Sequence, residues 1–306
     1  FDLRDPARAT TDIIGGTAKT PRLPGLGLHL LTTMRFGPTG DLYVNVGSST
    51  DHCESDGKAP DPAKPCASAE GPEALGAIRE YKMAWPAGTV TGWRTHARGL
   101  RNSMALAFHP ATGELWQAEN ARDAIQAAMP QLKSDENLPH EELNLIKADG
   151  HYGWPYCVDL QTPLPGWPAR QARCGERDQP VALLPPHAAP LDMIYYQGAM
   201  FPELRGRLLM TWHGYRRTGG RIIAAETDEQ GRPLTDIGGR YAIYPHGSLT
   251  YPAGAPSVKG RVLTPGWDRV AGRQPRGSPV FMAVAADGSI WVTDDRSRAI
   301  LRIARP

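Results

Sequence analysis

One hairpin pattern recurs along this chain and limits its fold more than any other feature. Three segments carry it: FGPTGDLYVNVGS from Phe36, FHPATGELWQAEN from Phe108 and VAADGSIWVTDD from Val284. Each has an apolar entry, a tight turn containing glycine, and a strand of alternating apolar residues. Thr-Gly and Asp-Gly turns between such strands are strong hairpin signals. A weaker fourth copy is LRGRLLMTWHG from Leu204.

Further strands follow at intervals, as in AIREYKM, GRIIAAET and AILRIAR. Antiparallel hairpins that recur without intervening helices indicate a β-propeller. A single sandwich is the alternative, but its strands would not repeat one hairpin formula along most of the chain. We therefore expect an all-β propeller domain over residues 1–306, with few short helices. Residues 124–132 are one candidate for a short helix inside a loop.

Two long irregular stretches, 49–75 and 121–143, interrupt the strands. Loops on a rigid scaffold tolerate insertion and carry function, so we expect functional loops here. Each of the two cysteine pairs, Cys53/Cys66 and Cys157/Cys174, lies in a loop rich in proline and glycine. Free thiols and zinc are the alternatives, but there is no CxxC and no suitably spaced Cys/His set. Two local disulfides are favoured, and they imply an oxidising compartment such as the periplasm or the exterior.

Charge and motifs exclude several functions. The net charge is +2, which argues against nucleic acid or anionic lipid as a partner. The longest apolar stretch, around 280–286, is too short to span a bilayer. There is no P-loop, dinucleotide GxGxxG, GxSxG elbow or CxxCH, and His140-Glu141-Glu142 lacks the second histidine of HExxH. An enzyme of this kind needs a cofactor or metal held by scattered loops.

The candidate site residues lie at predicted strand ends. His29 precedes the first repeat, although a lone histidine is more often structural. Arg101 and Asn102 offer a bidentate cation beside an amide, suited to a carboxylate or a quinone oxygen; the alternative is a salt bridge that caps a strand edge. The run from Glu119 through Asn120, Ala121 and Arg122 to Asp123 supplies oxygens for a hard cation such as calcium, and Glu141 and Glu142 form a second acidic cluster.

Several ordered blocks together resemble one family. They are GLRNSMALAFHPATGELWQAENARD, HEELNLIKADGHYGWPYC, PPHAAPLDMIYY with FPELRGRLLMTWHG, and PVFMAVAADGSIWVTDD. This order closely resembles the pyrroloquinoline quinone (PQQ)-dependent sugar dehydrogenases of the glucose/sorbosone dehydrogenase family, over nearly all of residues 25–306. The resemblance implies a six-bladed propeller with PQQ over the central channel, bridged to the protein by Ca²⁺.

The resemblance also implies roles for individual residues. His29 stands eight residues before Gly37, as the family's catalytic base stands before its Gly-Pro turn. Arg101 and Asn102 match the pair that contacts the quinone, and the carbonyls of Ala121 and Arg122 match the calcium ligands. The remaining implied cofactor contacts are His187, on the loop lining the cofactor face, and the basic candidates His213, Arg216 and Arg217.

The implied chemistry is oxidation of an aldose, or a sorbosone-like aldehyde, by hydride transfer to PQQ. Neutral His29 would take the proton of the anomeric hydroxyl. Arg101 and calcium would stabilise charge on the quinone oxygens. Electrons would pass to an external acceptor such as a cytochrome c.

Three departures from the family pattern stand out. Only 28 residues precede His29, where members carry about two further strand groups, so we expect a missing or separately supplied segment. Ser278 stands where an arginine typically precedes Pro-Val, with Arg276 and Arg273 as nearby substitutes. Leu28 stands where some members have an acidic residue. Two other functions stay open: a non-catalytic propeller that serves as a binding module or subunit, and a calcium-dependent propeller lactonase.

Overall fold

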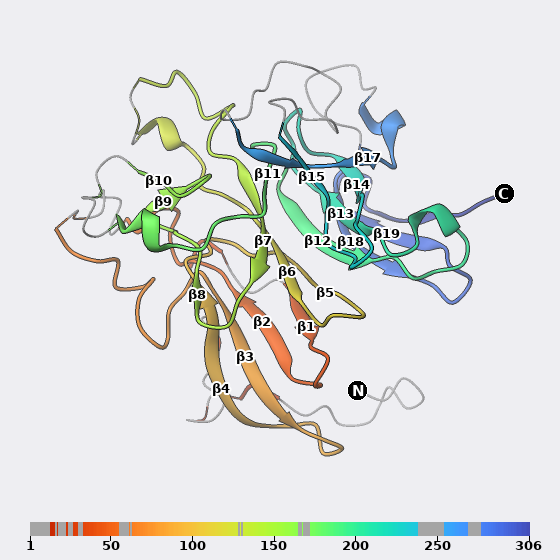
Figure 1. The fold of residues 1–306 in the computed structure, drawn as a ribbon, viewed down its shortest axis with the longest axis horizontal. Coiled ribbons are helices and arrows are strands. Elements are labelled where there is room, and N and C mark those ends of the chain that lie inside the picture. The colour runs from red at the N-terminus through yellow and green to blue at the C-terminus, as the bar shows by residue number, and fades with distance from the viewer. Residues whose placement is uncertain are drawn as a thin grey trace.

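The chain is described here from a computed structural model, which places strands and short 3-10 helices in order along it (Figure 1). The described residues are 13–15, 17, 23, 27–29, 33–54, 61, 63–127, 129, 131–164, 167, 172–237, 254–268 and 277–306. Among them, no helix has both the length and the apolar character that crossing a membrane requires.

The first sheet begins with the first predicted hairpin. Its strands, in spatial order, are β1 (Met34–Phe36), β2 (Leu42–Val46), β3 (Ala77–Ala84), β4 (Thr89–Arg98) and the short parallel β8 (Gly150–His151). Gly40 lies in the turn between β1 and β2 with a φ of +83°, which glycine adopts without steric cost. Met34 pairs with Val44 and Phe36 with Leu42, which confirms the first hairpin.

The second sheet contains the second predicted hairpin. Its order is β15 (Thr235–Ile237), β16 (Pro256–Val258), β11 (Ala182–Leu184), β7 (Glu141–Ile146), β6 (Leu115–Glu119) and β5 (Ala105–Phe108). Three consecutive antiparallel pairings run through β5, β6, β7 and β11, and β16 adds in parallel. The hairpin of Phe108–Asn120 is therefore confirmed as β5 and β6.

Two more sheets and a small hairpin complete the described strands. The third sheet contains, in spatial order, β12 (Pro190–Tyr195), β13 (Leu208–Trp212), β14 (Arg221–Ala225) and β17 (Gly260–Val262). The fourth sheet contains β18 (Pro279–Val284), β19 (Ile290–Asp294) and β20 (Ala299–Ile303). The small hairpin is formed by β9 (Cys157–Val158) and β10 (Thr162–Pro163). The third predicted hairpin is confirmed as β18 and β19. The weaker fourth copy is not a hairpin of its own, because β13 pairs with β12.

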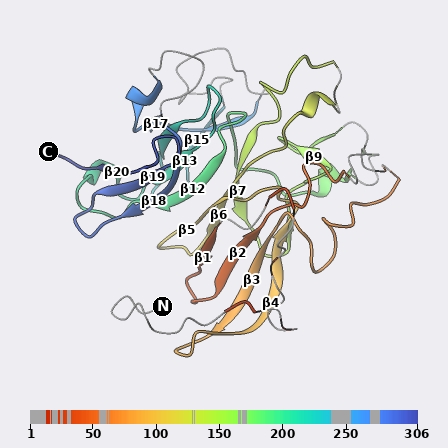
Figure 2. The same cartoon turned by 180° about the vertical axis from the view of Figure 1, so that it is seen from behind.

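The four larger sheets stand next to one another like the blades of a propeller (Figures 1 and 2). Their first strands make the connections: β1 contacts β5, β5 contacts β12, and β12 contacts β18. Apolar side chains from neighbouring sheets fill the spaces between them. Trp116 and Trp212, for example, share one buried cluster with Leu143, whereas Met282 and Ile290 pack against the other face of the third sheet. The prediction of an all-β fold built from repeated hairpins is thus confirmed.

Helices are short and confined to connections. In the described part of the chain, the 3-10 helices are η1 (Ile125–Ala127), η2 (Cys174–Glu176), η3 (Pro202–Leu204) and η4 (Pro265–Asp268). Within the described residues of 124–132, the expected helix is the single turn of η1; residues 128 and 130 lie outside the described residues. The loop expected over 121–143 is also shorter, because β7 already begins at Glu141.

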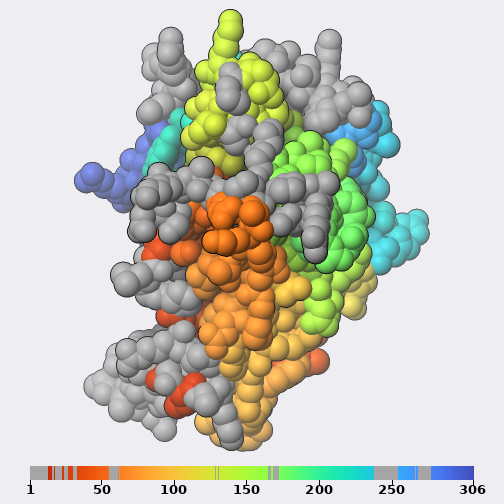
Figure 3. Space-filling model, turned by 90° about the vertical axis from the view of Figure 1, so that its left-hand side faces the viewer, coloured from red at the N-terminus to blue at the C-terminus, as the bar shows by residue number. Residues whose placement is uncertain are grey.

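Both predicted disulfides are present, Cys53–Cys66 and Cys157–Cys174, and the described residues include no free cysteine. They close loops that bury a small core of their own, with Ile125, Tyr156 and Trp167 packed among the four half-cystines. Figure 3 shows these loops together on one face of the molecule. Each disulfide would contribute about 3 kcal/mol by restricting the unfolded chain. The loops therefore have a rigid base although they contain few strands.

Candidate functional site

His29 lies against the loop that follows β2. Its backbone N–H donates to the carbonyl of Ser48 at 3.0 Å, and the Leu28 N–H donates to Ser49 at 2.9 Å. Gly47 makes this approach feasible, since a Cβ there would lie 2.4 Å from the His29 carbonyl oxygen. The backbone pairing therefore brings the candidate base to the same end of the first sheet as the loop 48–54.

The ring of His29 is held neutral. Burial, and then the nearby charge of Arg101, lower the pKa of His29 to about 4. Its Nε2 is buried and has no hydrogen-bond partner among the described residues. A buried, unpaired ring nitrogen is uncommon in folded proteins and calls for an explanation such as a ligand or a catalytic role.

Arg101 lies in the middle of the loop between β4 and β5 and is almost fully buried. Its guanidinium donates to the Asp51 carboxylate at 2.5 Å and to the carbonyls of Asn120 at 3.0 Å and Ala121 at 2.7 Å. The salt bridge that the sequence offered as an alternative therefore exists, and it extends to the backbone of the loop after β6. Arg101 thus joins three separate segments.

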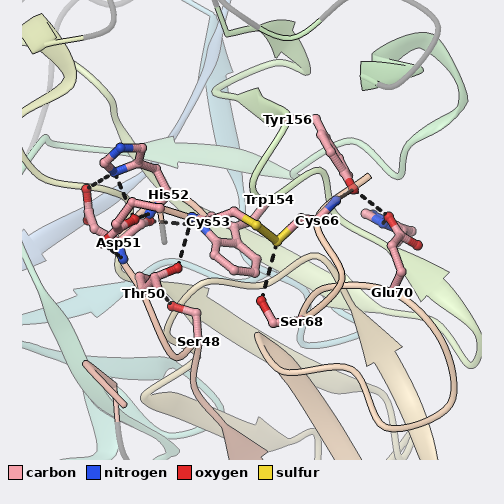
Figure 4. The surroundings of a disulfide bond; sticks show 12 residues. Ser48, Thr50, Asp51, His52, Cys53, Cys66, Ser68, Glu70, Trp154 and Tyr156 are labelled. Atoms are coloured by element: carbon pink, nitrogen blue, oxygen red, sulfur yellow. Dashed lines mark hydrogen bonds and ion pairs between the residues drawn. A yellow bond between two sulfur atoms is a disulfide. The ribbon is translucent and has the colours of Figure 1, made fainter. Parts of the chain in front are cut away.

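Asp51 was missed by the sequence analysis, although it organises this part of the site. Its carbonyl accepts hydrogen bonds from Arg101 Nε at 3.2 Å and from the Trp154 indole at 3.0 Å, and its carboxylate accepts one from the Asp123 N–H at 3.2 Å. Burial opposes its ionisation, but His52, Arg101 and Arg122 lower the pKa of Asp51 to about 2. Figure 4 shows that Asp51 lies two residues before the Cys53–Cys66 disulfide, beside Trp154.

A recognisable signal for Asp51 does exist in the sequence. Asp51 follows the second strand of the first hairpin by five residues, and Asp123 follows the second strand of the second hairpin by four. Because neighbouring blades present the same ends of their strands on one side, acidic residues at similar distances beyond those ends are expected to lie close together. Asp51 and Asp123 are therefore a pair that the residues following the two repeated strands indicate.

Two asparagines bring unpaired oxygens to the same region. The backbone N–H of Asn102 donates to the Glu119 carboxylate at 3.0 Å, and the Asn120 N–H donates to the Asn102 carbonyl at 3.1 Å. The Oδ1 atoms of both asparagines are buried without a partner among the described residues. Amide oxygens of this kind are suited to a hydrogen-bond donor or a hard cation.

The three glutamates near this loop act differently from a cation-binding cluster. Glu119, Glu141 and Glu142 are buried, and burial raises the pKa of Glu119 and of Glu141 to about 7. Burial, followed by the charge of Glu119, raises the pKa of Glu142 well above its usual value. Their carboxylates serve as acceptors for neighbouring groups, including the Gln117 side chain at 2.8 Å from Glu119.

His187 belongs to a second polar group beside Arg101. Its Nδ1 lies 3.6 Å from the Asp123 carboxylate, its Nε2 lies 2.7 Å from the Asp135 carbonyl, and Arg216 binds the Asp135 carboxylate at 2.6 Å. Although burial opposes it, the hydrogen bonds to Asp123 and Asp135 raise the pKa of His187. Asp123, Asp135 and His187 each place one ligand-type atom within 4.8 Å of the others.

The loop that carries His187 has strained backbone. His187 and Ala189 have φ values of +60° and +49°, which non-glycine residues rarely adopt. Glu141 supports this loop, because one carboxylate oxygen accepts from the Ala189 N–H at 3.2 Å and the other from the Ala121 N–H at 2.5 Å. Strained residues persist where the surroundings hold them and often mark functional sites. Glu141 therefore fastens the loop of His187 to the loop of Ala121.

Replacing Glu141 with glutamine is expected to separate the two loops, because a carboxamide retains one of the two acceptor oxygens and turns an N–H donor toward the other backbone amide. We expect amide hydrogen exchange to become faster at whichever of Ala121 and Ala189 faces the carboxamide NH2, and the protein to lose about 1–3 kcal/mol of stability in urea unfolding. Glu142→Gln is the matched control, since Glu142 is the adjacent buried residue and accepts from the Asn144 side chain instead. Equal protection at both amides in the two variants would contradict the role of Glu141.

The other predicted cofactor contacts lie in separate pairs. His213 Nε2 is 2.7 Å from the carboxylate of Asp295, the residue after β19, and Arg217 pairs with Glu136. Ser278 donates to the His213 carbonyl at 2.9 Å, and Leu28 is exposed. Arg276 and Arg273 lie outside the described residues. The structure thus brings together His29, Arg101, Asn102, Asn120, Ala121, Arg122, Asp123, His187 and Arg216.

The sequence matches one family model and resembles several known proteins. A family model described as Glucose / Sorbosone dehydrogenase matches residues 18–214. An uncharacterized protein of Borreliella burgdorferi is 26% identical over 213 residues, which are 68% of this chain and 48% of that protein. A pyrroloquinoline quinone-dependent sugar dehydrogenase of Hypocrea jecorina is 33% identical over 81 residues, covering 24% of this chain and 17% of that one. The chain spans about half the length of the Borreliella relative.

Solved structures share the fold at low identity. The iodide structure of a Trichoderma reesei Carbohydrate-Active Enzymes Family AA12 protein has a TM-score of 0.61 at 18% identity, over 90% of this chain and 68% of that one. The PQQ domain of pyranose dehydrogenase from Coprinopsis cinerea, in its holo form, has a TM-score of 0.59 at 18% identity, over 89% and 69%. With the family model matching more than half of its length, the chain belongs to the glucose/sorbosone dehydrogenase family.

Proposed function

We propose that this protein is a PQQ-dependent dehydrogenase that oxidises an aldose or a sorbosone-like aldehyde. The observation that carries the proposal is the grouping of a buried, neutral His29 with Arg101 and with unpaired oxygens on Asn102 and Asn120. Family membership supports it, as does the Hypocrea jecorina relative, whose name is pyrroloquinoline quinone-dependent sugar dehydrogenase.

The residues present fit a bound quinone and its cation. The Ala121 and Arg122 carbonyls, with Asn120 and Asp123, offer the oxygen ligands that Ca²⁺ prefers, and a Trichoderma reesei relative is described as a calcium structure. Arg101, Asn102, His187 and Arg216 would hold PQQ, with His213, Arg217 and Arg276 as the further basic candidates. Bound PQQ supplies the hydride acceptor.

The chain's own residues would do the remaining work. His29 is neutral at pH 7, so its free ring nitrogen is able to accept the proton of the sugar's anomeric hydroxyl as the carbonyl forms. Arg101 would stabilise the negative charge that develops on the quinone oxygens, because a guanidinium in a buried site stabilises nearby negative charge more than one in water does. Trp154 and the Cys53–Cys66 loop would keep water away from this side of the site.

We further propose that the complete fold is a six-bladed propeller, to which the described sheets contribute four neighbouring blades within a single domain of residues 1–306. The two disulfides support an oxidising location, and we propose the periplasm or the exterior. A cytochrome c or similar carrier would accept the electrons.

The test is reconstitution of the full chain with PQQ and Ca²⁺, followed by dye reduction with a panel of aldoses. Turnover that requires both additions supports the proposal. Absence of turnover, together with no change in the PQQ absorbance on mixing, would overturn it.

A non-catalytic binding module is the second candidate. It is favoured by one observation, since the predicted cofactor-binding cations are already paired with Asp51, Asp123 and Asp135. In that case the same titration would show no PQQ absorbance change while the protein stays folded.

A further inference from the structure

The hydrogen bonds of Arg101 all go to oxygen atoms in the described part of the chain. An arginine carries five N–H donors. Nη1 donates to the carbonyls of Asn120 at 3.0 Å and Ala121 at 2.7 Å, and Nε donates to the Asp51 carbonyl at 3.2 Å. Nη2 donates to the carboxylates of Asp51 at 2.5 Å and Asp123 at 3.4 Å. Every donor therefore has an acceptor, and the side chain is only 3% exposed.

Three carbonyl oxygens and two carboxylate oxygens around one positive charge also form the environment that a hard divalent cation takes. Ca²⁺ binds six to eight oxygens, drawn from carboxylates and backbone carbonyls. One of the five acceptors is the carbonyl of Ala121, and another is the carboxylate of Asp123, both proposed above as calcium ligands. The guanidinium and the cation therefore need the same atoms.

We propose that Arg101 holds the place of the divalent cation, so that Ca²⁺ and the Arg101 guanidinium bind to these oxygens in competition. This inference rests on the proposed function. A guanidinium and a Ca²⁺ ion on the same carbonyl would repel each other strongly inside a buried site. Calcium therefore enters as Arg101 withdraws from Asn120, Ala121 and Asp123.

The exchange has a direct consequence for ligand binding. As the structure stands, no donor of Arg101 is available to a bound molecule, because all five are satisfied within the protein. Withdrawal from the carbonyls frees the two Nη1 donors, which are otherwise committed to Asn120 and Ala121. Binding of Ca²⁺ thus makes the Nη1 donors of Arg101 available to an anionic or quinone oxygen. The Ca²⁺ ion is able to bind such an oxygen as well.

Arg122 provides a matched control for charge. Its guanidinium is also buried in the same region, with Nε 3.8 Å from the Asp51 carboxylate. Among the described residues, its guanidinium donates to the Asp123 carbonyl at 3.5 Å and not to the Asn120 and Ala121 carbonyls that Arg101 contacts. Arg122→Gln therefore deletes the same side-chain charge from the same region, keeps the Arg122 backbone carbonyl in place and does not release the Asn120 and Ala121 carbonyls.

The experiment measures Ca²⁺ binding to the full chain by calorimetry, without PQQ or sugar. For Arg101→Gln we expect the affinity for Ca²⁺ to rise at least about tenfold over the unmodified protein, and for Arg122→Gln about threefold or less. Arg101→Lys keeps the charge but has three donors, and we expect an intermediate gain. It is the variant to use if Arg101→Gln does not fold.

The outcomes separate this inference from the proposed function. Equal or weaker Ca²⁺ binding by the Arg101 variants, or the same gain from Arg122→Gln, would overturn the competition even if the reconstituted protein oxidises sugars. Tighter binding by Arg101→Gln alone would support the competition even if no sugar is oxidised. Terbium luminescence sensitised by Trp154, which contacts Asp51, gives a second measure of ion binding beside Arg101.

Discussion

Replacing His29 with alanine is expected to lower the turnover of the PQQ-reconstituted protein about 10²- to 10⁴-fold, the usual contribution of a general base. The reason is that His29 provides a buried ring nitrogen with no partner, next to Arg101, whereas alanine leaves the sugar hydroxyl without a proton acceptor. PQQ binding, followed by its absorbance, is expected to remain close to that of the unmodified protein.

The control for this variant is His109→Asn. The His109 ring lies in the turn between β5 and β6, where Nδ1 accepts from the Thr112 N–H at 2.9 Å, an interaction that an asparagine oxygen is able to replace. Its turnover should stay near that of the unmodified protein. Full activity of His29→Ala would remove His29 from the mechanism, whereas loss of PQQ binding would assign it to the cofactor site instead.

The same residue predicts a pH profile. Because the pKa of His29 is lowered to about 4, the ring is neutral above that pH and becomes protonated below it. Protonation removes the base, so kcat/KM should be retained above pH 4 and fall as the pH drops through about 4. A histidine with the ordinary value of about 6.5 would already lose half its activity near pH 6.5. The pH at which kcat/KM falls on the acid side distinguishes a lowered pKa of His29 from an ordinary one.

Replacing Asp192 with alanine is expected to cost about 3–5 kcal/mol of unfolding free energy, the largest effect on stability that we predict. Asp192 is fully buried in β12 and accepts from the Met282 N–H of β18 at 2.8 Å and from its neighbour Met193 at 2.9 Å. It also pairs with Arg35 of β1. One carboxylate thus joins the first strands of three sheets.

The strand irregularities explain why this carboxylate matters. The pairing of β12 shifts between Pro190 and Asp192, and that of β18 shifts between Pro279 and Met282. Such shifts take backbone groups out of the regular ladder, and a buried N–H without an acceptor is costly. With alanine, the Met282 N–H loses its side-chain acceptor, and the Arg35 guanidinium loses its carboxylate partner and keeps the Met34 carbonyl and the Thr33 hydroxyl.

Urea unfolding of Asp192→Ala and Asp192→Asn provides the measurement. Asparagine keeps one acceptor oxygen and the side-chain volume, so its loss should be clearly smaller than that of alanine. If both variants unfold at the same urea concentration as the unmodified protein, the carboxylate does not hold the sheets together.

The local pattern was sufficient to predict the strands. Each confirmed hairpin depends on alternation and on a turn residue such as Gly40, and both act over a few neighbouring residues. The prediction of a fourth hairpin at Leu204 was wrong because it too depended on a local pattern. The apolar residues that begin this copy form the 3-10 helix η3 instead of a strand. The strand that follows, β13, pairs with β12, which lies too far back in the sequence for a local pattern to indicate.

The sequence by itself determined the all-β class, the two disulfides and a set of polar residues at strand ends. Only the tertiary structure decided which of them meet. Arg101 lies 50 residues from Asp51, and Arg35 lies 157 residues from Asp192, so neither pair leaves a periodic signal. The packing of neighbouring sheets also removed Glu119, Glu141 and Glu142 from water, which turned an apparent acidic cluster into acceptors that support the backbone. Strand formation depends on near neighbours, whereas partner choice and burial depend on how the sheets pack.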